Sequence, residues 1–179
     1  WVHLFGVFRP KLQARFRELN VDSFDSASYF RKAWLRSDQN YLALNGKWYA
    51  ALRVPMTSDG RTRKKLEQSG LDLPSLEAEE SKVIKLLCKF DRDEVSLKKV
   101  LDAVIEYDER LTRSSDVRSL RNKYERTLKD RPWRSCDCPF CKHAGIHLLI
   151  FRGTNRNKRR GAHNTLMLYR SITGKPLVD

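Results

Sequence analysis

The chain has 179 residues, and a composition of 40% hydrophobic and 32% charged residues is typical of a water-soluble globular protein. It contains no run of about 18 apolar residues, so we expect no membrane-spanning helix and no membrane partner. A net charge of +14 instead indicates a polyanionic partner such as nucleic acid, because cations that meet phosphates release condensed counterions. The chain starts at Trp1 and enters an apolar run at once, so we expect that it was cut from a longer protein.

The first 26 residues predict a strand, a helix and a second strand. Residues 2–8 form an apolar run, Arg9-Pro10 is suited to open a helix, and residues 21–26 form another strand-like run. Such a unit favours two parallel strands.

A hairpin is expected next. Two strand-like runs, 41–44 and 48–54, flank Asn45-Gly46, the dipeptide that most strongly favours a two-residue hairpin turn. Residues 55–65 are polar and are interpreted as a connector.

Residues 75–129 are charged and carry apolar residues at helical spacing, which predicts three helices. Ser96 is a candidate cap for the second helix and Asp116 for the third, and Pro132 is expected to end the third. Beyond them, the sequence predicts a strand over 145–151, a basic loop over 153–161 and a helix over 163–172.

Three of the four cysteines, Cys136, Cys138 and Cys141, fall within six residues. Thiols this close suit a metal ion better than a disulfide framework, which also favours a reducing, cytoplasmic compartment. Zn²⁺ prefers four ligands in a tetrahedron, so a fourth ligand must come from elsewhere in the chain. A closed site of four protein ligands leaves no position for a reactive water, so we interpret this zinc as structural.

Three histidines are candidates for that fourth ligand. His163 is favoured because it begins a predicted helix that can fold back onto the cysteines, whereas His143 is close enough to Cys141 to be strained. His147 lies in a predicted strand and remains an alternative. Cys88 stands apart and is interpreted as a core residue of its helix.

The predicted loop over 153–161 and the residue just before it carry five cations and no acid. Flexible glycines and Arg side chains in such a loop can follow a phosphate backbone, and a solvated loop without a ligand is the alternative. The candidate nucleic-acid-binding residues are Arg152, Arg156, Lys158, Arg159 and Arg160.

Two separated stretches of the chain resemble one family. The Cys136-Asp-Cys138-Pro-Phe-Cys141 turn with the distant His163 is similar to the zinc motif of the tRNA-guanine transglycosylases. The amino-terminal motifs, His3-Leu-Phe-Gly6-Val and Asn20-Val-Asp22-Ser-Phe-Asp25, resemble the last two barrel strands of that family. The run from Arg152 to Asn164 resembles most the DNA-modifying branch, which places a 7-deazaguanine in DNA, and Arg131-Pro-Trp133 is similar to that branch too.

This resemblance implies an α/β fold, the C-terminal portion of a (β/α)8 (TIM) barrel. Such a barrel needs about 250 residues, so this chain is expected to hold only the last strands. We expect barrel strands and the hairpin in 1–60, an inserted helical segment in 61–130, and a zinc-binding and basic-loop subdomain with a C-terminal helix in 131–179.

The family reaction implied by the resemblance is a base exchange through a covalent aspartyl intermediate. The nucleophile carries over to Asp25, for which a simple capping role is the alternative. Phe5 and Gly6 match positions that line the base pocket, although Phe5 is equally compatible with a plain core role. Arg31 matches an arginine of the target-strand site. Asp22 matches a neighbouring acid with a structural role.

The resemblance is incomplete at two places on the nucleic-acid side. Tyr29-Phe30 stands where the family has Pro-Thr, and Phe8 stands where the family has a glycine. The family's general base and base-recognition aspartates belong to its earlier half, so we expect no exchange activity from this chain alone. The missing strands would come from upstream sequence or a partner chain, and homodimers are also compatible.

Three other functions stay open at this point. One is a tRNA-directed transglycosylase of the same family. Another is a non-catalytic, zinc-dependent nucleic-acid-binding module. A third is a protein-interaction module that uses the inserted helices.

Overall fold

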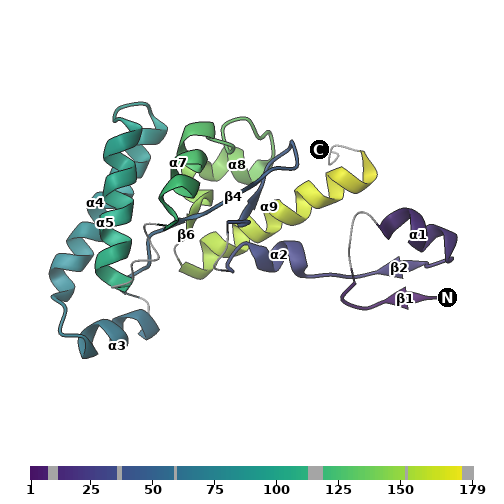
Figure 1. The fold of residues 1–179 in the computed structure, drawn as a ribbon, viewed down its shortest axis with the longest axis horizontal. Helices are drawn as coiled ribbons and strands as arrows, with labels where there is room; N and C mark the ends of the chain where they lie inside the picture. Colours follow the sequence, from purple (N-terminus) through teal and green to yellow (C-terminus); the bar gives the residue numbers. More distant parts are fainter. Residues whose placement is uncertain (8–11, 36–37, 59, 113–118, 152, 175–179) are drawn as a thin grey trace.

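The amino-terminal segment forms a small parallel unit that projects from one end of the molecule (Figure 1). The computed structural model describes residues 1–7, 12–35, 38–58, 60–112, 119–151 and 153–174. Strands β1 (His3–Leu4) and β2 (Ser23–Phe24) pair in parallel, and helix α1 (Gln13–Glu18) connects them. The predicted strand–helix–strand unit is therefore confirmed, but each strand is two residues long, much shorter than expected. The start proposed for the helix at Arg9-Pro10 lies outside the described residues.

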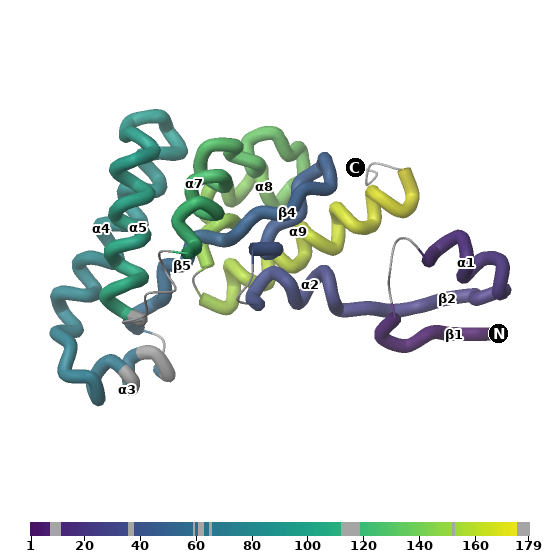
Figure 2. The backbone as a smooth tube through the Cα atoms, viewed as in Figure 1, coloured from purple at the N-terminus to yellow at the C-terminus, as the bar shows by residue number. Residues whose placement is uncertain are grey.

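The predicted hairpin is also confirmed. Strands β3 (Tyr41–Leu42) and β4 (Trp48–Tyr49) pair antiparallel around Asn45 and Gly46. Gly46 has φ +77°, a left-handed conformation that glycine adopts without strain, and the Asn45 side chain accepts a bond from the Lys47 amide at 3.0 Å. The hairpin passes between helices α7 and α9, as the tube in Figure 2 shows.

A second parallel pair joins segments nearly a hundred residues apart. Strand β5 (Leu52–Arg53) pairs with β6 (Ile150–Phe151), with Leu52 opposite Ile150. The sequence did not reveal this pairing, because nothing local to either strand specifies its partner.

The middle of the chain is helical, as predicted. Helices α4 (Leu73–Asp91) and α5 (Leu97–Thr112) pack side by side, and α7 (Arg121–Asp130) packs against α5 (Figure 1). The Ser96 hydroxyl accepts a bond from the Lys99 amide at 3.4 Å, which confirms the proposed cap of α5. The cap proposed at Asp116 lies outside the described part of the chain.

The segment 55–65 is not entirely a connector, because helix α3 (Gly60–Gln68) begins within it. This helix has few apolar residues, so its sequence lacks the periodicity on which the other helices were predicted.

The C-terminal part departs most from expectation. A short helix α8 (Pro139–Ala144) leads into a 3-10 turn η2 (Gly145–Leu148), so the strand expected over 145–151 shrinks to β6. Helix α9 (Gly153–Thr173) then begins ten residues before the helix predicted from His163. The predicted basic loop is therefore wrong, since that segment is the first half of α9.

One apolar cluster joins the hairpin, α4, α5, α7 and the cysteine segment. Its fully buried members include Tyr41, Leu52, Leu87, Tyr124 and Leu149. The described strands form three separate two-stranded ladders, of which β3–β4 and β5–β6 contribute to this cluster, and no closed barrel exists in the part of the chain that the structure describes. Across the same residues, no helix has the length and apolar character needed to cross a membrane.

Candidate metal centre

The three clustered cysteines lie on a tight turn that opens helix α8. Cys138 is the N-cap residue of α8, Pro139 follows at the first helical position, and Cys141 lies one turn along. The Cys141 amide donates to the Cys138 sulfur at 3.3 Å. The turn therefore points its sulfurs inward, and Cys136, Cys138 and Cys141 are all buried.

His163 on α9 completes the cluster. Its Nδ1 atom lies 3.2 Å from the Cys138 sulfur and 3.6 Å from the Cys141 sulfur. The potential ligand atoms of Cys136, Cys138, Cys141 and His163 all lie within 4.8 Å of one another. The structure thus brings together the four residues that the sequence selected, and together they could hold one metal ion.

A hydrogen bond on the far side of the imidazole fixes the tautomer of His163. Its Nε2 atom lies 2.8 Å from the Leu42 carbonyl oxygen, which can only accept, so Nε2 carries the proton. Nδ1 is then the nitrogen with the lone pair, and it is the one that faces the thiols. Such a partner for the second ring nitrogen is usual for metal-bound histidines.

Tyr41 covers the cluster from the hairpin. Its ring stacks on the His163 imidazole with centroids 4.2 Å apart, and its hydroxyl lies 3.2 Å from the Cys141 sulfur. Burial and the neighbouring Cys141 raise the pKa of this phenol well above its usual range. Tyr41 therefore stays neutral and seals the centre from solvent.

Contacts within the cluster shift the pKa values of Cys136, Cys141 and His163. Hydrogen bonds with the other thiols lower the pKa of Cys136, whereas hydrogen bonds with Cys136 and Cys138 raise the pKa of Cys141. For His163, burial lowers the pKa but hydrogen bonds with Cys136 and Cys138 outweigh it, and the result is a rise to about 9. Three thiolates and a neutral imidazole can therefore coexist here only when a cation compensates their buried charge.

The other candidate ligands lie elsewhere. His143 is exposed on α8. His147 instead accepts a bond from Arg156 at 2.9 Å and places its other nitrogen 3.4 Å from the sulfur of Cys88. Cys88 is half-buried on α4 and takes no part in the metal cluster.

The cations of the predicted basic loop are divided by their position on α9. Arg160 is fully buried, Arg156 is half-buried against His147, and Lys158 and Arg159 are exposed. Arg152 lies outside the described residues. Among the four described cations of this group, Lys158 and Arg159 are the two whose side chains are exposed, as a nucleic-acid contact would require.

Arg160 has a structural role. Its guanidinium donates to the carbonyl oxygens of Ala33, Leu148 and Ile150 at 2.6–3.2 Å, and to the Asn157 side chain at 2.6 Å. Burial lowers the pKa of Arg160 to about 9, so the side chain is still charged at neutral pH. It is a buried cation held by carbonyl dipoles, and it ties α9 to the end of α2 (Ser28–Lys32).

Two further residues of α9 bind α2 from the same face. A side chain at Gly161 would place its Cβ 2.8 Å from the Phe30 ring, so only glycine permits this close approach. The Asn164 amide donates to the carbonyl oxygens of Tyr29 and Asn40. The helix that carries His163 therefore also positions α2, which starts three residues after Asp25.

The predicted substrate residues Phe5, Gly6 and Asp25 meet at the carboxyl ends of β1 and β2. The Gly6 amide donates to Asp25 Oδ1 at 2.6 Å, and the Asp25 amide donates to the Leu4 carbonyl oxygen. Phe5 is 80% exposed, so it is not a core residue of the described structure. Asp22 accepts a bond from the Val2 amide at 2.6 Å, while Arg31 is exposed on α2.

The sequence comparison decides the relationship. The chain is 37% identical over 172 residues to a DNA-guanine transglycosylase from Salmonella montevideo. This chain is similar in sequence to a guanine transglycosylase. The match covers 96% of this chain but 41% of the relative, so the chain spans about two fifths of that protein's length. No family model matches the chain.

Sequence reasoning missed several residues of this chain that support the candidate metal centre. Tyr41 and the Leu42 carbonyl belong to the hairpin, and their distance along the chain from His163 hid their role. Asn157, Arg160, Gly161 and Asn164 recur at a spacing of three and four residues, which is the spacing of one helix face. That polar stripe was the available indication that α9 begins early.

Proposed function

We propose that this chain is the C-terminal part of a transglycosylase that replaces guanine in DNA with a 7-deazaguanine. The similarity to a DNA-guanine transglycosylase along nearly the whole chain carries this proposal. The position of Asp25 directly after β2, at the edge where parallel strands usually present catalytic residues, supports it.

Asp25 is the proposed nucleophile. One carboxylate oxygen attacks C1′ of the target deoxyguanosine, the C1′–N9 bond breaks, and guanine leaves with the electron pair and takes up a proton. The N9 nitrogen of the incoming deazaguanine then attacks C1′ and loses its proton to solvent, the bond from C1′ to the Asp25 oxygen breaks, and the carboxylate is released. The bond from the Gly6 amide orients this carboxylate, and the exposed ring of Phe5 lies at the same edge, where it can cover a purine face.

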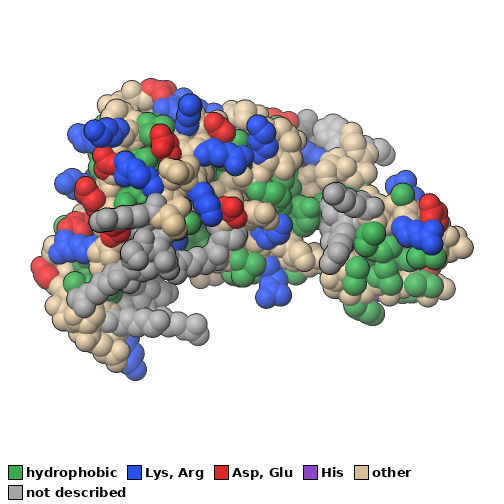
Figure 3. Space-filling model, viewed as in Figure 1, with side chains coloured by type: hydrophobic (Ala, Val, Ile, Leu, Met, Phe, Trp, Pro, Cys, Tyr) green, Lys and Arg blue, Asp and Glu red, His purple; other side chains and the backbone are tan. Residues whose placement is uncertain are grey.

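The β1–β2 unit is the proposed attachment point for the rest of a barrel. It exposes the apolar side chains of Trp1, Val2, Phe5, Val7, Leu12 and Leu19. Figure 3 shows hydrophobic side chains gathered on the surface of this unit. Neither strand has a second neighbour among the described residues. Pairing with further parallel strands, from the same or a partner chain, would bury the exposed apolar side chains and the unpaired strand edges. It would also complete the substrate pocket.

The metal is proposed to be a structural Zn²⁺. Tetrahedral bonds of about 2.3 Å to sulfur and 2.0–2.1 Å to nitrogen place a sulfur and a nitrogen about 3.5 Å apart. The observed separations of 3.2 and 3.6 Å from His163 Nδ1 agree with that value. Three thiolates also fit the reducing, cytoplasmic compartment proposed for this protein.

Exchange of labelled 7-deazaguanine into DNA by the full-length protein tests this function. Asp25→Asn should abolish both incorporation and a covalent protein–DNA adduct, because an amide is not a competent nucleophile. Asp22→Asn is the matched control, and it should retain the adduct. An adduct that persists in Asp25→Asn would refute the assignment of the nucleophile.

Further outcomes of these assays identify the nucleic-acid substrate and the role of residues 1–179. Incorporation into tRNA but not DNA would show a tRNA-directed enzyme. Binding of DNA with no exchange in any assembly would favour a non-catalytic nucleic-acid-binding module. Residues 1–179 alone should show no exchange. Robust turnover by them would contradict the proposal that further barrel strands are needed to complete the substrate pocket.

A further inference from the structure

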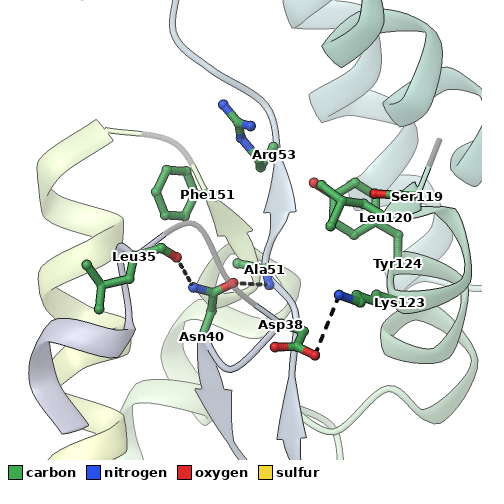
Figure 4. Close-up of a pocket in the computed structure, with 10 residues that line it drawn as sticks. All are labelled: Leu35, Asp38, Asn40, Ala51, Arg53, Ser119, Leu120, Lys123, Tyr124 and Phe151. Carbon is green, nitrogen blue, oxygen red and sulfur yellow. Dashed lines mark hydrogen bonds and ion pairs between the residues drawn. The ribbon is translucent and has the colours of Figure 1, made fainter. Parts of the chain in front are cut away.

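A groove runs between helix α7 and the segment that holds strands β4 and β5. It consists of two hollows of about 610 and 450 Å³, which share Asp38 and Lys123 in their linings. Figure 4 shows the larger hollow, with Lys123 and Tyr124 on the α7 side and Arg53 and Ala51 on the strand β5 side. The smaller hollow continues along α7 to Arg126 and reaches Lys47 and Trp48 of the hairpin.

The lining of this groove is strongly cationic. Its described charged residues are four cations and one carboxylate, namely Lys47, Arg53, Lys123, Arg126 and Asp38. The ion pairs available to them are long, at 3.6 Å for Lys123 with Asp38 and 4.0 Å for Arg126 with Asp130. Such exposed pairs contribute little energy and are readily exchanged for a phosphate.

Arg53 supplies a cation at the floor of the larger hollow. Its Nε atom lies 4.0 Å from buried Asp108, and its side chain is 20% exposed. Within the described residues, one terminal nitrogen of its guanidinium is buried and has no hydrogen-bond partner. The part of Arg53 that lines the hollow adds positive charge there, which would attract an anionic phosphate oxygen.

Aromatic rings border the other end of the groove. Trp48 is half-buried, its ring lies 5.4 Å from that of Tyr29, and the Lys32 ammonium lies 4.4 Å from the Trp48 centroid. Arg126 lies over the Tyr49 ring at 4.9 Å. Cations beside aromatic faces are the combination that binds a sugar–phosphate backbone and stacks its bases.

We propose that this groove binds the sugar–phosphate backbone of a nucleic-acid strand, separately from the Asp25 edge. The inference deepens the proposed function, since it names where the substrate strand is held away from the reacting base. The groove lies in the central part of the molecule, away from the β1–β2 unit, as the positions of α7 and β4 in Figure 1 show.

The metal centre supports one wall of the groove. Leu42, whose carbonyl oxygen binds His163, pairs directly with Trp48 across the hairpin. Loss of the metal should therefore loosen Trp48 and Lys47 while it leaves Lys123 and Arg126 on α7.

Fluorescence anisotropy with labelled oligonucleotides tests the proposal. The variant Lys123→Gln/Arg126→Gln removes two groove cations, and Lys98→Gln/Lys99→Gln removes the same charge from exposed positions of α5. Each phosphate contact is worth roughly five- to eightfold in affinity at about 0.1 M salt, so the groove variant should bind single-stranded DNA roughly 25- to 60-fold more weakly. The slope of log K against log salt should fall by about 1.4, whereas the control should change little. Matched melting temperatures would show that both variants fold.

Each other outcome is decisive. The proposed role of the groove would be refuted if both variants weakened DNA binding equally, or if the groove variant did not weaken it. If the groove variant weakens binding to an RNA hairpin but not to DNA, the groove stands and the DNA-directed function fails. Loss of exchange in Asp25→Asn with unchanged DNA affinity would support the function independently of the groove.

Discussion

Replacement of Arg160 separates a structural role from a nucleic-acid-binding role. The side chain donates five hydrogen bonds, four of them to backbone carbonyl oxygens of α2's end, η2 and β6. Arg160→Met would leave the carbonyls of Ala33, Leu148 and Ile150 buried without this donor. Each unsatisfied acceptor costs about 1–3 kcal/mol, and partial rehydration reduces the total, so we expect a loss of about 3–5 kcal/mol.

Urea denaturation followed by circular dichroism measures this loss. Arg159→Met is the matched control, because Arg159 is the exposed neighbour on the same helix and should change the stability by no more than about 0.5 kcal/mol. Arg160→Lys keeps the charge but supplies fewer donors in a different geometry, so it should be intermediate. It also keeps the test informative if Arg160→Met fails to fold.

The result that would refute this reasoning is specific. If Arg160→Met and Arg159→Met had equal stability, and only Arg160→Met lost DNA affinity, Arg160 would face a ligand and not the core. The segment would then behave as the basic loop that its composition suggests.

Two further predictions concern packing and protons. Gly161→Ala should destabilise the protein by about 1–2 kcal/mol despite the helix propensity of alanine, because the new Cβ meets the Phe30 ring. In a double-mutant cycle measured by thermal denaturation, Phe30→Ala should relieve most of that loss. Metal affinity, measured by chelator competition, should fall at least about tenfold per pH unit between pH 8 and pH 6, because a His163 pKa raised to about 9 means that metal binding must displace a proton. A pH-independent affinity would contradict the whole site, because its thiols and a protonated His163 must all lose protons to bind a metal.

The sequence predicted the features whose causes are local. Three thiols on one turn specify a metal site wherever a fourth ligand can reach them, and His163 was the histidine that a returning helix could deliver. Asn45-Gly46 specified the hairpin because its turn needs a left-handed backbone. The helices α4, α5 and α7 each carry an apolar stripe at helical period.

The sequence misled where distant contacts decide the structure. Arg156 and Arg160 have the composition of a nucleic-acid-binding loop, but buried carbonyls and His147 hold them on a helix. The pairing of β5 with β6 and the contact of Gly161 with Phe30 depend on residues far away in the chain, so no local pattern reported them. The groove along α7 was missed for the same reason, since its cations come from separate elements.

Metal analysis of the purified protein tests the central claim most directly, that Cys136, Cys138, Cys141 and His163 hold one structural Zn²⁺. Mass-spectrometric metal content should give one zinc per chain for the wild type and for Cys88→Ser, and close to none for Cys138→Ser or His163→Ala. A wild-type chain purified without zinc that takes up none on reconstitution, or a Cys138→Ser variant that keeps a full equivalent, would contradict the account.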